Sequence, residues 1–91
     1  MNKSELVEKI SGRLDMPVDK VNSVIEETLK VITYELAKGN SVQFTGFGTF
    51  SAKTRAAHKG RNPRTGETIQ LPPSTIAHFK QGKTLRAVLN T

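Results

Sequence analysis

Several residue types are scarce in this 91-residue sequence, and each scarcity excludes a class of protein. There is no cysteine, so disulfides and thiolate metal ligands are excluded. No apolar run approaches the roughly 20 residues that span a membrane, and residues 1–9 lack the apolar core of a signal peptide. We therefore expect a cytoplasmic protein with no membrane partner, and a chain of this length has room for a single domain over residues 1–91.

Acidic residues are nearly absent from the second half of the chain. Residues 1–38 hold six Lys or Arg and seven Asp or Glu, whereas residues 39–91 hold eight Lys or Arg and one acid, Glu67. The formal net charge of +6 therefore comes entirely from the second half. Such a distribution is typical of a surface that binds a polyanion, although a basic face kept for solubility would give the same count.

Catalytic constellations are also lacking. The two histidines, His58 and His78, are far apart in the sequence, and Glu67 is the only carboxylate side chain in their half. The sequence contains no nucleophile elbow, glycine-rich phosphate loop or zinc-ligand spacing. We therefore predict that the protein is not an enzyme and uses no cofactor and no metal. His58 is interpreted as a polar side chain that faces a groove, because no second metal ligand is near it.

The first 40 residues carry helical periodicity. Asn2 is a suitable cap for a helix that ends near residues 12–17, and Pro17 suits the first turn of a second helix from about residue 18 to residue 38. Two helices joined by a short turn form a hairpin. Their apolar stripes, which include Leu29 and Ile32, are interpreted as core or subunit interface rather than as a ligand site.

From residue 41 the apolar period changes from 3.6 to 2, which predicts strands, and Gly46-Phe47-Gly48 predicts a tight turn between two of them. Helical spacing returns at residues 82–89. Together these patterns predict an α+β fold with a helical-hairpin body (1–40), a three-stranded antiparallel sheet with a β-ribbon arm (41–81, the arm at about 53–75) and a short C-terminal helix (82–91). We expect most of the phenylalanines in the core, covered by the long helix: Phe44, Phe47, Phe50 and Phe79.

The arm comprises residues 53–75. Between residues 53 and 70 its only large apolar side chain is Ile69. We expect a β-turn that starts at Asn62-Pro63, with Gly66 just after it, and a returning strand that Pro72-Pro73 ends. A two-stranded ribbon without an apolar face is only marginally stable in water, so we expect contact with another surface to account for it. In the outgoing strand, alternation places these side chains on one side: Lys53, Arg55, Ala57, Lys59 and Arg61.

The composition of the arm suits a narrow nucleic-acid groove. Arginine is attracted by the negative potential of a narrow minor groove, and an amide such as Asn62 can hydrogen-bond the acceptors there. Pro63 is a turn former, but it is also rigid and apolar and lacks an N–H, so it can wedge between base pairs. We expect the groove to be lined by Lys53, Arg55, His58, Lys59, Arg61, Asn62 and Arg64.

Two motifs make the chain similar to a known family. Residues 46–50, Gly-Phe-Gly-Thr-Phe, and residues 60–66, Gly-Arg-Asn-Pro-Arg-Thr-Gly, closely resemble the HU and integration host factor family of bacterial DNA-binding proteins. Residues 1–6 and 79–85 are also similar, so the resemblance spans the chain. It implies an intertwined dimer whose ribbon arms enter the minor groove, with Pro63 as an intercalating tip. It also implies phosphate contacts at Lys3, Lys80, Lys83 and Arg86.

Three positions depart from the family pattern: His58 stands where arginine is usual, Gln81 where proline is usual, and Pro17 where a serine or threonine cap is common. We predict a nucleoid-associated homodimer, with a heterodimer as the alternative, that binds double-stranded DNA with little sequence preference and favours bent, nicked or gapped forms. The alternatives are a sequence-preferring subunit like those of integration host factor, an RNA-binding module, or an assembly scaffold. The expected dimer core contains Leu29, Ile32, Phe44, Phe47, Phe50 and Phe79.

Overall fold

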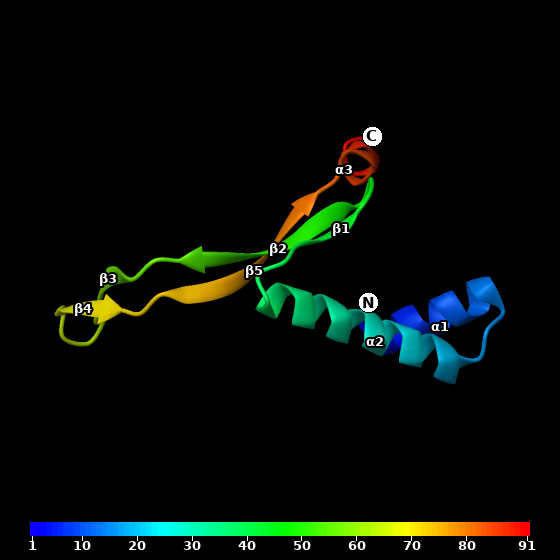
Figure 1. Ribbon diagram of the computed structural model, residues 1–91, viewed down its shortest axis with the longest axis horizontal. Coiled ribbons are helices and arrows are strands. Elements are labelled where there is room, and N and C mark those ends of the chain that lie inside the picture. Colours follow the sequence, from blue (N-terminus) through cyan, green and yellow to red (C-terminus); the bar gives the residue numbers. More distant parts are fainter. The chain divides into compact units, whose positions relative to one another are not determined.

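The computed structural model describes residues 1–91, which divide into two compact units, Met1–Tyr34 and Glu35–Thr91. The α+β fold predicted from the sequence is confirmed, and none of the helices combines the length and apolarity needed to cross a bilayer. In chain order (Figure 1) the elements are α1 (Lys3–Leu14), α2 (Val18–Ala37), β1 (Val42–Phe44), β2 (Gly48–Arg55), β3 (His58–Arg61), β4 (Thr68–Leu71), β5 (Ser74–Gln81) and α3 (Lys83–Leu89).

The two long helices begin and end at local signals in the sequence. The Asn2 side chain accepts a hydrogen bond from the Glu5 amide at 2.9 Å, as the predicted N-cap requires. Asp15 ends α1 in the left-handed conformation (φ 52°), which Asp tolerates better than most residues. The carbonyl of Pro17 accepts from the Val21 amide at 3.2 Å. Pro17 therefore lies immediately before the first residue of α2, and the helix begins at Val18, where the sequence predicted.

The three-stranded sheet has the order β1-β2-β5 and is antiparallel throughout. β1 pairs only with the first three residues of β2, where Val42 lies opposite Phe50. β2 and β5 continue together beyond it for the rest of their length, to the pair Arg55 and Ser74. Figure 1 shows these two strands leaving the sheet as a ribbon. The expected arm therefore grows directly out of the sheet.

The four phenylalanines form one cluster, but they are less buried than we expected. Phe50 packs against Phe79 with ring centroids 4.8 Å apart, and Phe44 meets both Phe47 and Phe50 edge to face. Phe47 keeps 51% of its surface exposed and Phe44 keeps 40%. The prediction that most of these rings are buried core is wrong for the single chain, in which the only buried hydrophobic side chains are Val7 and Val21.

The arm is made of two ladders, because its outgoing strand, which we expected to be continuous, is interrupted opposite the predicted break at Pro72-Pro73. The outgoing strand ends at Arg55 and resumes at His58, because the facing residues Pro72 and Pro73 have no N–H to donate. The register is nevertheless preserved, since Arg55 lies opposite Ser74 and, three residues further along each strand, His58 lies opposite Leu71. The interruption is therefore a joint in one ribbon and does not shift the pairing.

Gly48 gives a test of packing in this sheet. It is buried, and a Cβ at this position would overlap the Phe79 ring and lie 2.7 Å from the Lys80 carbonyl oxygen. We expect Gly48→Ala to lower the free energy of unfolding by about 1–3 kcal/mol through overpacking. Gly12→Ala is the matched control: nothing lies within 4 Å of its added Cβ, so it should stabilise α1 by roughly 0.5–1 kcal/mol. Urea unfolding that ranks the two variants the other way would contradict this packing.

Candidate nucleic-acid interface

The tip of the arm is a tight, hydrogen-bonded turn. The Asn62 carbonyl accepts from the Gly66 amide at 2.8 Å, and the Asn62 amide donates to the Glu67 carbonyl at 2.8 Å. The first bond spans five residues, so the turn closes one residue later than the β-turn that the sequence predicted. Gly66 has φ 75°, which agrees with its predicted left-handed conformation. The turn leaves Pro63 exposed at the end of the ribbon.

The side chain of Asn62 is part of this turn. Its Oδ1 accepts from the Arg64 amide at 2.9 Å, an interaction that fixes the backbone on both sides of Pro63. The acceptor of the side chain is thereby used, whereas its Nδ2 hydrogens are donors. Because the minor-groove edges of A·T pairs present acceptors, a donor is the group that this position needs.

The basic side chains of the arm are exposed and occur in pairs along it. Lys53 and Arg55 share one face of β2, and Lys59 and Arg61 share one face of β3, because alternate residues of a strand point to the same side. Arg64 is exposed in the turn. His58 differs from these residues, because it lies half-buried on the other face of the ribbon, opposite Leu71. The structure thus places His58 off the face of these basic side chains, as the alternation along the strand predicts.

The Gly46-Phe47-Gly48 turn meets the start of α3 at Gly82. The Gly46 carbonyl accepts from the Leu85 amide at 3.1 Å, and the Phe47 carbonyl accepts from the Gly82 amide at 2.7 Å. A Cβ on Gly82 would lie 2.6 Å from the Gly46 oxygen, so only glycine allows this approach. The contact fixes the start of α3, the helix that carries Lys83 and Arg86, both of which are exposed.

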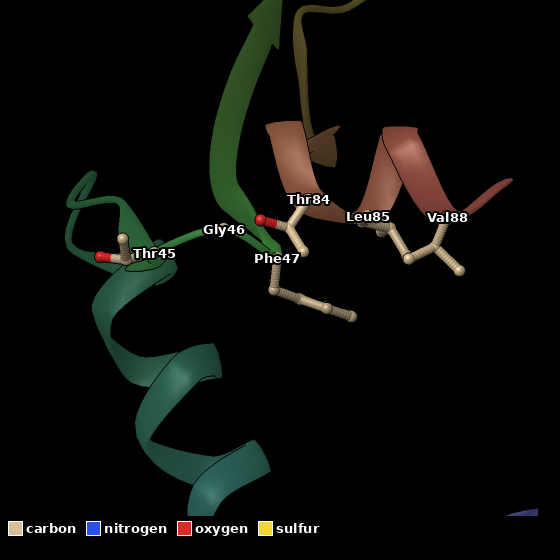
Figure 2. A pocket seen from close by; sticks show the side chains of 6 residues that line it. All are labelled: Thr45, Gly46, Phe47, Thr84, Leu85 and Val88. Carbon is tan, nitrogen blue, oxygen red and sulfur yellow. The ribbon is translucent and has the colours of Figure 1, made fainter. Parts of the chain in front are cut away.

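The same contact leaves an open apolar pocket of about 350 Å³. Figure 2 shows the side chains of Phe47, Leu85 and Val88 lining it on one side of the turn. Val88 is 62% exposed, so this surface is apolar and uncovered in the single chain. Sequence periodicity indicated an apolar face on the last helix, but the pocket depends on the turn meeting α3, which the sequence did not reveal.

The amino-terminal unit carries one predicted contact residue, Lys3, and the structure gives it a partner. Its Nζ donates to Oε1 of Glu26 at 2.7 Å, although both side chains remain about half exposed (48% and 46%). The hydrogen bond from Lys3 and its positive charge hold the pKa of the Glu26 carboxyl below its usual range. The ion pair thus persists at neutral pH and is lost only as the pH falls through that lowered pKa. The pair joins residues too far apart in sequence for spacing to predict it.

Comparisons with known proteins agree with this geometry. The family profile described as "Bacterial DNA-binding protein" matches residues 1–90. The chain is 43% identical to DNA-binding protein HU of Buchnera aphidicola subsp. Baizongia pistaciae, over 100% of this chain and 99% of that protein. It is 42% identical to integration host factor subunit beta of Colwellia psychrerythraea, over 99% of this chain and 96% of that protein. A structure of Anabaena HU crystallised with DNA superposes with a TM-score of 0.92, at 31% identity, over 98% of this chain and 97% of that one.

A helical unit, a sheet with a basic ribbon arm and a short terminal helix define a DNA-binding protein of the histone-like type, which is not an enzyme. The chain belongs to the family of bacterial DNA-binding proteins that includes HU and integration host factor. The resemblance inferred from residues 46–50 and 60–66 is confirmed.

Proposed function

We propose that this protein binds duplex DNA as a homodimer, with little sequence preference, and bends it by inserting its two arms into the minor groove. The observation that carries the proposal is the arm: an exposed basic ribbon, closed by a hydrogen-bonded turn, with a rigid proline at its end. A ribbon of this kind stabilises little by itself, so its composition is explained by what it binds. Of the classes that the sequence left open, family membership favours DNA over RNA or an assembly scaffold.

The residues have distinct roles in this proposal. Asn62 donates its Nδ2 hydrogens to groove acceptors, and Pro63 inserts between base pairs. The remaining side chains neutralise phosphates and release counterions, which gives affinity without base reading. In the groove these are Lys53, Arg55, Lys59, Arg61 and Arg64, and on the body they are Lys3, Lys80, Lys83 and Arg86. His58 is proposed as a polar contact in the same groove.

The homodimer accounts for the apolar surface that one chain leaves uncovered. Phe47 and Val88 line an open pocket, and Leu29 on α2 is 53% exposed. A second copy would bury such surfaces, as small domains often require. The proposed dimer core is made of Leu29, Ile32, Phe44, Phe47, Phe50 and Phe79. A dimer also supplies two arms, one for each side of a bend in the DNA. Its expected location is the nucleoid.

Comparison of intact and flexible duplexes tests the bending part of the proposal. Bending a short site costs on the order of 1–6 kcal/mol, and a nick or gap removes part of this cost. We expect a nicked or gapped duplex to bind about tenfold or more tightly than the intact duplex of the same sequence, and a scrambled sequence to bind like the original. Equal affinity for nicked and intact duplexes, or tighter binding of duplex RNA than of DNA in competition, would contradict it.

A further inference from the structure

The register of the sheet brings together polar residues that lie far apart in the sequence. Residues opposite each other in an antiparallel pair share a face, as do alternate residues of one strand. Thr49 therefore shares a face with its partner Lys80, and Ser51 shares that face with its partner His78. Lys53 of β2 lies on the same side. We name this side the polar face; the phenylalanine pair Phe50 and Phe79 lies on the other side.

His78 lies at the centre of the polar face. It is two residues from Lys80 along β5, and its partner Ser51 is two residues from Lys53 along β2. The side chain is half-buried, whereas both lysines are exposed. No Asp or Glu occurs on β1, β2, β5 or α3, so the charged groups on these elements are all cations. An imidazolium here has no acidic partner within the sheet, and an anionic ligand would be its natural counter-ion.

The second histidine, His58, lies in the arm, half-buried on the face of the ribbon opposite to that of Lys59 and Arg61. Nδ1 of His58 lies 3.3 Å from the Ala56 carbonyl, to which a protonated Nδ1 can donate. That assignment makes Nε2 the nitrogen that takes up the second proton and then becomes a donor. No acid lies on β3 or β4, where the charged residues are Lys59 and Arg61. The nearest acid in the chain is Glu67, which directly precedes β4.

We propose that His78, together with His58, binds DNA phosphate in its protonated form, so that DNA affinity is proton-linked. This inference rests on the proposed function and adds to it a residue, His78, and a dependence on pH. Histidine is the side chain whose charge changes between pH 5 and 8, and contact with an anion favours its charged form. A proton on either histidine adds a cation to a part of the chain whose other charged side chains are basic, and a bound phosphate favours that protonated form.

The proposal predicts a change in the salt dependence of DNA affinity with pH, which an unspecific effect of low pH would not produce. Each additional charge that neutralises a phosphate makes the slope of log affinity against log salt more negative by roughly 0.9. The slope for the wild-type protein should therefore be steeper at pH 5.5 than at pH 7.5. Carboxylates of ordinary pKa stay ionised over this range, but α-amino groups titrate near its upper end, so a variant without histidines is the necessary control.

The experiment measures affinity for one intact duplex at pH 5.5 and 7.5, across a salt series. The proteins are the wild type, His58→Gln, His78→Gln, the double variant and His78→Lys, each checked for fold by circular dichroism. We expect wild-type affinity at a fixed salt concentration to be on the order of tenfold higher at pH 5.5. The double variant should lose most of this ratio, each single variant part of it, and His78→Lys should bind more tightly than wild type at pH 7.5.

The outcomes separate this inference from the proposed function. If the double variant keeps the full pH ratio, proton linkage through the histidines is wrong. If only His58→Gln lowers the ratio and His78→Lys binds like wild type at pH 7.5, the assignment of His78 is wrong. If every protein binds DNA with a steep salt slope that does not change with pH, the proposed function stands and the linkage fails. If the wild type fails to bind the duplex at either pH, the proposed function itself fails.

Discussion

Replacing residues 56–73 by Asn-Gly should lower affinity for intact duplex DNA by about 100-fold or more while leaving the sheet folded. Arg55 and Ser74 are direct partners, so a two-residue turn can join them without a change of register. The replacement removes Lys59, Arg61 and Arg64, and the loss of at least three cations from each chain accounts for the expected drop. Affinity is measured by fluorescence anisotropy, and folding by urea unfolding.

Two further variants separate the charge of the arm from its length. Lys59→Gln combined with Arg61→Gln and Arg64→Gln keeps the ribbon but removes the three cations that the arm replacement also removes. This variant should lose most of the affinity that the arm-replaced protein loses. Thr68→Ser combined with Gln70→Asn, on the returning strand of the same ribbon, is the matched control and should bind like wild type. An arm-replaced protein that still binds at full affinity would show that the arm is not the DNA-binding element, and one that unfolds would show that the arm belongs to the core.

Pro63→Ala should reduce the bend in DNA more than it reduces binding. The wedge is needed to unstack a base step, whereas most of the affinity comes from phosphate contacts that this change leaves in place. We expect fluorescence energy transfer between the ends of a short duplex to fall toward the value of free DNA, with affinity reduced less than about tenfold. An unchanged bend would rule out the wedge.

The turn itself needs a control in this experiment, because Pro63 also fixes the backbone. The Thr65 hydroxyl accepts from the Glu67 amide at 3.3 Å, so Thr65→Ala loosens the same turn and leaves the proline intact. If loosening were the cause of a smaller bend, this variant would show it too. We expect it to bend DNA like wild type.

Local patterns predicted the elements of this fold well. The Asn2 cap, the turn at Gly46-Phe47-Gly48 and the left-handed Gly66 all depend on neighbouring residues, so sequence periodicity and turn chemistry could identify them. The position of Pro63 at the end of the ribbon follows from the same signals. Most of the candidate site could be predicted from the sequence for this reason, because the arm is a local hairpin.

Contacts between distant segments could not be predicted in this way. The Lys3–Glu26 pair and the carbonyl contacts of Gly46 with α3 join parts of the chain that only folding brings together. The break at Pro72-Pro73 in the returning strand was predicted, but the matching interruption of the outgoing strand between Arg55 and His58 was not. The effect of the two prolines on the facing strand appears only once the register is known. Burial of the phenylalanines was overestimated, since periodicity indicates which side chains are apolar but not whether one chain covers them.

The dependence of DNA affinity on salt tests the central claim most directly, since the claim is that the basic arm binds phosphate-lined DNA electrostatically. The measurement is log affinity against log salt for the intact duplex, with the full chain and with the arm-replaced protein. The predicted slope for the full chain is steep, roughly −0.9 for each phosphate neutralised, and markedly shallower once the arm is replaced. A flat plot for the full chain, or the same slope for both proteins, would contradict this account.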